Sequence, residues 1–185
     1  MSLDTIQDTL LHQMSDLLSA ERQFAKLLQQ SAKAADSEEV KQMELTHHQE
    51  TLQQAENLQQ AFTALGEKAE KMTCKAAAGI VEEATSTLKE EKPKGAFKDI
   101  AILSSSLRVE HYEIAGYRAA IAVARAFGNK QVVQVLQTNL RQEEATAKKI
   151  EVASAQILKS MPTPAAVAQP ATSKAPAKKA ASKAA

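Results

Sequence analysis

The residues with the clearest chemical potential are two carboxylates near the middle of the segment 97–127. Helical spacing places Glu110 and Glu113 one turn apart on a stripe that is apolar at both ends, with Leu103 before them and Ile121 after them. Unpaired carboxylates on an inward face are costly, at several kcal/mol per ion. The pattern therefore predicts that positive charge lies against this pair.

The other long helical segments carry polar side chains at the same point of their apolar stripes. Glu21 interrupts the first stripe and Glu143 the last, while His47 and Glu50 lie three residues apart on one face of the second. No Lys or Arg falls on these stripes, so the pattern predicts two multivalent cations as the neutralising charge. Oxygen donors with one imidazole suit iron or manganese. The predicted metal ligands are Glu21, His47, Glu50, Glu110, Glu113 and Glu143.

Three further side chains are expected next to these ligands. Tyr117 and Gln54 each lie one turn beyond a predicted ligand, Glu113 and Glu50, and both can hydrogen-bond ligating carboxylates. Packing alone is an equal reading for Tyr117. Glu144 is an alternative ligand or a solvated neighbour of Glu143, and the solvated position is favoured.

Composition indicates that long helices position these residues. The chain has 185 residues, of which 44% are hydrophobic and 3% aromatic, with no Trp and five Gly and five Pro. Asp36 and Glu39 resemble a capping box, and Gly128 can end a helix. The sequence predicts an all-α antiparallel four-helix bundle whose long connection, 67–95, contains a short helix over 74–90. The four long helices are expected at about 3–34, from the Asp36 cap to about 65, at about 97–127 and at about 130–158.

Charge divides the chain into a body, 1–159, and a tail, 160–185. Residues 159–185 hold five Lys and no acid, whereas residues 1–158 hold 18 Lys and Arg against 22 Asp and Glu. The Ala, Pro and Lys-rich tail is expected to be disordered and to solubilise the protein or to contact DNA weakly. The absence of an 18-residue apolar run and of a signal-like N-terminus, together with a single cysteine, Cys74, predicts a cytoplasmic protein without membrane contact.

Four stretches resemble the YciE/YciF-like branch of the ferritin-like superfamily. They are Asp16-Leu-Leu-Ser-Ala-Glu21, His47-His-Gln-Glu-Thr51, Arg108-Val-Glu-His-Tyr-Glu-Ile-Ala-Gly-Tyr117 and Leu140-Arg-Gln-Glu-Glu-Ala-Thr146. The resemblance covers about residues 3–158 and is most specific over 108–117. It implies a ferritin-like four-helix bundle, a di-iron carboxylate centre, a homodimer and a ferroxidase or stress-related role.

The second helix departs from the usual di-iron pattern, in which Glu-x-x-His occurs on two helices. His47-x-x-Glu50 has the reverse order. Glu44-x-x-His47 has the usual order, but Glu44 falls on the edge of the predicted stripe, so Glu50 is preferred. The fourth helix has Thr146 where a second His would stand, which predicts a centre poor in imidazole.

Three functions remain open at this point. The first is a ferroxidase-type oxidoreductase that uses oxygen or peroxide to oxidise iron at a centre of two iron ions. The second is a non-enzymatic, stress-related helical dimer with structural metal or none and a tail that contacts nucleic acid. The third is a manganese enzyme that destroys peroxide.

Overall fold

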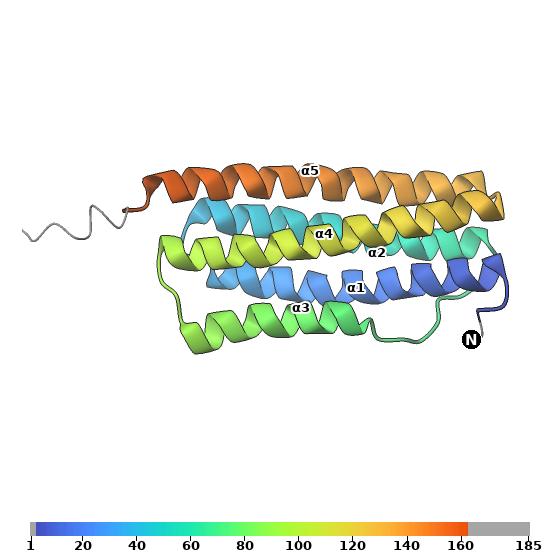
Figure 1. Ribbon diagram of the computed structural model, residues 1–185, viewed down its shortest axis with the longest axis horizontal. Coiled ribbons are helices and arrows are strands. Elements are labelled where there is room, and N and C mark those ends of the chain that lie inside the picture. The colour runs from blue at the N-terminus through green and yellow to red at the C-terminus, as the bar shows by residue number, and fades with distance from the viewer. Residues whose placement is uncertain (1–2, 163–185) are drawn as a thin grey trace, which may run out of the picture.

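The computed structural model describes residues 3–162 and is built from helices alone over that range (Figure 1). Four long helices lie side by side along the long axis. They are α1 (Ile6–Ala34), α2 (Glu38–Ala64), α4 (Ala96–Phe127) and α5 (Lys130–Ser160). Helix α1 neighbours α2 and α4, and α5 neighbours the same two, so the four helices form a square bundle. The predicted fold class is confirmed. The predicted tail lies, from residue 163 on, outside the described residues.

The long connection crosses the outside of the bundle. It contains α3 (Lys75–Ser86) and a short π-helical turn, η1 (Thr87–Glu91), and α3 lies along α1 and α4 in Figure 1. Alanines of α3 pack on Phe24 and Val109, and Cys74 is buried at its start, where its sulfur accepts the Ala77 N–H. This contact explains how a helix of 12 residues holds its place. Within residues 3–162, no helix combines the length and the apolar character needed to cross a bilayer.

The helix ends correct two sequence-based predictions. Helix α1 begins at Ile6 rather than at Leu3, because Thr5 and Asp8 form a capping box. Helix α2 is capped by Ser37, whose side chain accepts the Val40 N–H, and not by Asp36. The Asp36 carboxylate instead accepts hydrogen bonds from the Gly95 N–H and the Lys98 ammonium at the start of α4.

A buried carboxylate completes the same corner. Asp99, which is 3% exposed, accepts the backbone N–H groups of Asp36 and Ser37 at 2.9 and 3.0 Å. The α1–α2 turn is thus held against the start of α4 from both sides. At the other end, Gly128 adopts a left-handed conformation (φ 86°) between α4 and α5, as predicted.

Two apolar clusters bracket the centre of the bundle. One contains Leu10, Met14, Leu58 and Leu136, and the other contains Val40, Ile102, Leu103 and Ile150. Along every long helix, the residues predicted to bind metal lie between the two clusters. The apolar packing on both sides therefore keeps water away from a polar layer in the middle of the bundle.

Candidate metal centre

Five of the six predicted ligands lie in this polar layer. Glu21 of α1, His47 of α2, Glu110 and Glu113 of α4, and Glu143 of α5 are at most 2% exposed. Each long helix thus contributes at least one side chain to the same interior level. The antiparallel arrangement produces this convergence because each of these residues lies near the midpoint of its own helix.

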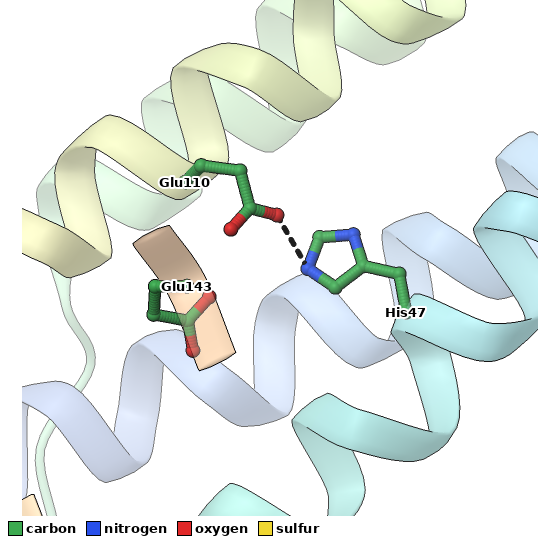
Figure 2. A group of neighbouring side chains, drawn as sticks. All are labelled: His47, Glu110 and Glu143. Carbon is green, nitrogen blue, oxygen red and sulfur yellow. Dashed lines mark ion pairs between the residues drawn. The ribbon is translucent and has the colours of Figure 1, made fainter. Parts of the chain in front are cut away.

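The first three-residue group joins α2, α4 and α5. His47, Glu110 and Glu143 each offer one ligand atom, and these atoms lie within 4.8 Å of one another. Figure 2 shows His47 reaching toward Glu110, with Glu143 beside the pair. His47 Nε2 and Glu110 Oε1 are 2.6 Å apart. The two groups are not aligned for a hydrogen bond, so both atoms remain without a hydrogen-bond partner.

The second group joins α1, α4 and α5. Glu21, Glu113 and Glu143 meet the same 4.8 Å limit, so Glu143 belongs to both groups. Neither oxygen of Glu113 has a hydrogen-bond partner, and one oxygen of Glu21 and one of Glu143 also lack one. Two adjacent groups of candidate ligand atoms thus share one carboxylate, the arrangement that a two-metal centre would need.

Among residues 3–162, no Lys or Arg is buried, so no cationic side chain of this range lies inside the layer to neutralise these groups. Burial raises the pKa of Glu110 to about 8, and burial likewise raises the pKa values of Glu21, Glu113 and Glu143 well above their usual range. In the absence of metal, the layer therefore retains protons that multivalent cations would displace.

Burial has the opposite effect on the imidazole. It lowers the pKa of His47, which favours the neutral ring at pH 7. Neutral imidazole is the form that binds metal, because a ring nitrogen keeps its lone pair. The donor set is therefore four carboxylates and one neutral imidazole, which suits iron or manganese.

Glu44 is buried and Glu50 is partly exposed, which is the reverse of what the sequence predicted. Glu44 is fully buried; one of its oxygens accepts the Ser106 hydroxyl at 2.8 Å and the other has no partner. Burial raises its pKa to about 7. Glu50 is 28% exposed and belongs to neither three-residue group. Preferring Glu50 to Glu44 as the interior carboxylate was wrong, because the buried face of α2 passes through Glu44 and Thr51.

Of the three side chains predicted to lie next to the ligands, one contacts a predicted ligand and two do not. Tyr117 donates a hydrogen bond to Glu21 and accepts one from Asn139 Nδ2 at 2.9 Å, so it orients a predicted ligand. Gln54 is buried, but its side-chain oxygen has no partner, and its backbone carbonyl accepts the Asn139 amide. Glu144 is exposed and paired with Arg118, so it does not support the cluster.

Two participants, Ser106 and Asn139, escaped the sequence analysis, and a third, Glu44, was considered there but set aside. Glu44 had a usable signal in the order Glu44-x-x-His47. Ser106 and Asn139 had weaker signals, since a small or amide side chain on an inward stripe is compatible with simple packing. Their roles follow only from the contacts that they make with Glu44 and Tyr117.

The fold and the site define a four-helix bundle with a long crossover and a buried layer of carboxylates and one histidine. Residues 5–161 match the family described as "Domain of unknown function (DUF892)", and the chain belongs to this YciF-like family. It is 33% identical to Protein YciF of Escherichia coli K12 over 147 residues, which cover 79% of this chain and 88% of YciF.

Two solved structures extend this similarity. The E. coli stress protein YciF superposes with a TM-score of 0.82 at 30% identity, over 86% of this chain and all of the other. YcfI from Rhodopseudomonas palustris gives a TM-score of 0.76 at 36% identity, over 82% and 97% of the two chains. Family membership and the ferritin-like bundle predicted from the sequence are thereby confirmed.

Proposed function

We propose that the polar layer binds two iron or manganese ions and that the protein is a ferroxidase-type oxidoreductase of a stress response. One observation carries the proposal: two three-residue groups of buried ligand atoms share Glu143, and most of their oxygens lack any other partner. A cluster of this kind is costly to keep in a folded core unless cations occupy it.

The residues present fit such a centre. His47, Glu110 and Glu143 would hold one ion, and Glu21, Glu113 and Glu143 the other, with Glu44 next to the first group. Glu44 joins His47 in the Glu-x-x-His order that is typical of di-iron bundles. Bound iron would supply one-electron redox chemistry toward oxygen or peroxide.

The chain itself orients the ligands and excludes water. Tyr117, whose hydroxyl accepts a hydrogen bond from Asn139, fixes Glu21, and Ser106 fixes one oxygen of Glu44. Hydrogen-bonded neighbours of this kind keep ligands in place before metal arrives. The apolar clusters on both sides exclude water from the layer, so charges that change during oxidation do so in a medium of low dielectric.

The stress-related role comes from the relative. E. coli YciF is described as a stress protein, and iron oxidation that consumes oxygen or peroxide is a fitting activity for such a protein. The homodimer expected from the family resemblance also stays a prediction.

The test is an anaerobic titration with Mn(II) of the full chain and of two adjacent variants. Glu143→Gln removes the residue common to both groups and should weaken both sites by at least about tenfold, the range seen when metal-site residues are lost. Glu144→Gln changes the same type of residue one position away, on the surface, and should bind two ions per chain like the wild type. Wild-type affinity in the Glu143→Gln variant would refute the site.

Oxidation is tested separately, by following Fe(II) in air at near-ultraviolet wavelengths. A rate above that of buffer, lost in Glu143→Gln, is expected. Two bound ions without any acceleration would support the non-enzymatic alternative. Oxygen release from peroxide after manganese loading would support the peroxide-destroying alternative.

A further inference from the structure

A pocket between α2 and α5 is open to the surface and is lined by one residue of the candidate metal centre, His47. Its volume is about 260 Å³, and its walls include His47, Glu50, Thr146 and Lys149. This volume has room for a hydrated cation but is below the roughly 300–1,000 Å³ of sites for drug-sized ligands. The pocket is therefore suited to an ion or a diatomic molecule.

The buried end of the pocket is formed by His47, one of the candidate metal ligands. His47 is 2% exposed, and its Nδ1 has no hydrogen-bond partner in the described part of the chain. Its Nε2 lies 2.6 Å from Glu110 Oε1, inside the first three-residue group. A single imidazole thus borders both the pocket and the cluster.

The open end of the pocket carries the Glu50 carboxylate, which makes one hydrogen bond and one long ion pair. Glu50 Oε2 accepts the Thr146 hydroxyl at 3.1 Å, while Glu50 Oε1 lies 3.9 Å from the Lys149 ammonium. The Lys149 side chain is more than half exposed, so this ion pair is weak and easily exchanged. Glu39 adds a second carboxylate to the pocket wall.

A second pocket reaches the cluster from the α1–α2 face but has the opposite charge. Its volume is about 290 Å³, and it borders Glu21. Arg22 and Lys26 also line it, so their positive charges repel metal ions. The two pockets are similar in size, and their electrostatics distinguish them.

From these observations we propose that divalent cations reach the centre through the α2–α5 pocket, with Glu50 as a transit ligand and Lys149 as its exchangeable counter-ion. The arriving cation replaces Lys149 at Glu50, exchanges water for the oxygens of Glu50, and passes inward to His47 and Glu110. This inference rests on the proposed two-metal function, and it assigns Glu50 to the route rather than to the resident ligand set.

The test measures how fast the full chain takes up Co²⁺ under nitrogen, by stopped-flow absorption of the coordinated ion. At about 20 mM ionic strength, Glu50→Gln should slow loading at least about fivefold, whereas Lys149→Gln should accelerate it about threefold, because focused charge at a cleft changes cation association rates by 10-fold or more. Both effects should shrink at about 0.5 M salt. Final stoichiometry should remain two ions per chain in both variants.

The matched control is Lys26→Gln, which removes the same charge from the wall of the α1–α2 pocket. Its loading rate should stay close to that of the wild type. Equal acceleration by Lys26→Gln and Lys149→Gln would overturn the proposed route, since net charge alone would then set the rate.

Two other results would also overturn the inference, and they differ from each other. A stoichiometry of one ion in Glu50→Gln would make Glu50 a resident ligand while leaving the two-metal centre intact. Failure of the wild type to bind Co²⁺ or Mn²⁺ would remove the proposed function together with the route.

Discussion

Replacing Glu110 by Gln should stabilise the metal-free protein at alkaline pH while it weakens metal binding. Glu110 is fully buried, and burial raises its pKa from 4.5 to about 8. The folded state therefore holds its proton more tightly than the unfolded state does. Stability from this group is complete below pH 4.5 and is lost as the pH rises toward 8.

The size of this stability change follows from the pKa of Glu110 in the unfolded state, 4.5, and in the folded state, about 8. Between pH 5 and pH 8.5, Glu110 alone should lower the free energy of unfolding of the wild type by about 4 kcal/mol. Gln has nearly the same shape and no titratable proton, so that part of the pH dependence disappears. The net gain at pH 8.5 is thus about 4 kcal/mol.

The assay is urea unfolding followed by far-ultraviolet circular dichroism, with a chelator present, at pH 5 and pH 8.5. Glu144→Gln is the control, because its side chain is exposed and paired with Arg118, and its pH dependence should match that of the wild type. If Glu110→Gln and the wild type lose the same free energy between the two pH values, Glu110 is not held protonated by burial and the reasoning fails.

Three more predictions follow from other contacts. Tyr117→Phe should lower the free energy of unfolding by about 1–3 kcal/mol, because Glu21 and Asn139 both lose a partner; an unchanged urea midpoint would mean that the hydroxyl is dispensable. Asp99→Ala should cost about 1–2 kcal/mol, since two buried N–H groups of the α1–α2 turn lose their acceptor, and wild-type stability in the same assay would contradict this. Any binding of DNA should be weak, should fade between about 50 and 200 mM salt, and should require residues 163–185 with their four Lys; identical gel shifts with and without this segment would exclude a role for the tail.

The fold was largely predictable because its signals are local. Each of these signals, namely the apolar stripes, the break at 92–95 and Gly128, spans only a few residues. Together they predict four helices of similar length and the order in which short and long connections join them. The errors were small and had specific causes. Asp36 had the side chain of an N-cap, but its carboxylate is engaged by Gly95 and Lys98, about 60 residues away in sequence.

The candidate site was harder to predict because small errors in helical periodicity change which residues face the interior. From Val40 to Ala61, the buried residues of α2 follow alternating steps of four and three, whereas the predicted stripe placed Glu50 inside and Glu44 at its edge. A 3.6-residue period permits both choices at each turn, and only the packing of α1 and α5 against α2 selects one of them. The buried positions are Val40, Glu44, His47, Thr51, Gln54, Leu58, Ala61 and Phe62.

The same ambiguity about the buried face affects α4 least, so the prediction of its inward-facing carboxylates was the most reliable. Glu110 and Glu113 are one turn apart, so a shift of phase that exposed one would still leave the other inside. Both are fully buried. In α5, Glu143 was predicted to face inward while Asn139 was overlooked, because Leu140 beside it is the more hydrophobic choice for the stripe.

The central claim is tested most directly by diffraction from crystals of the full chain grown with Mn(II), using the anomalous signal of the metal. The account predicts two peaks inside the bundle, one among His47, Glu110 and Glu143 and the other among Glu21, Glu113 and Glu143. Peaks confined to the surface, or an interior without any peak at saturating Mn(II), would contradict it.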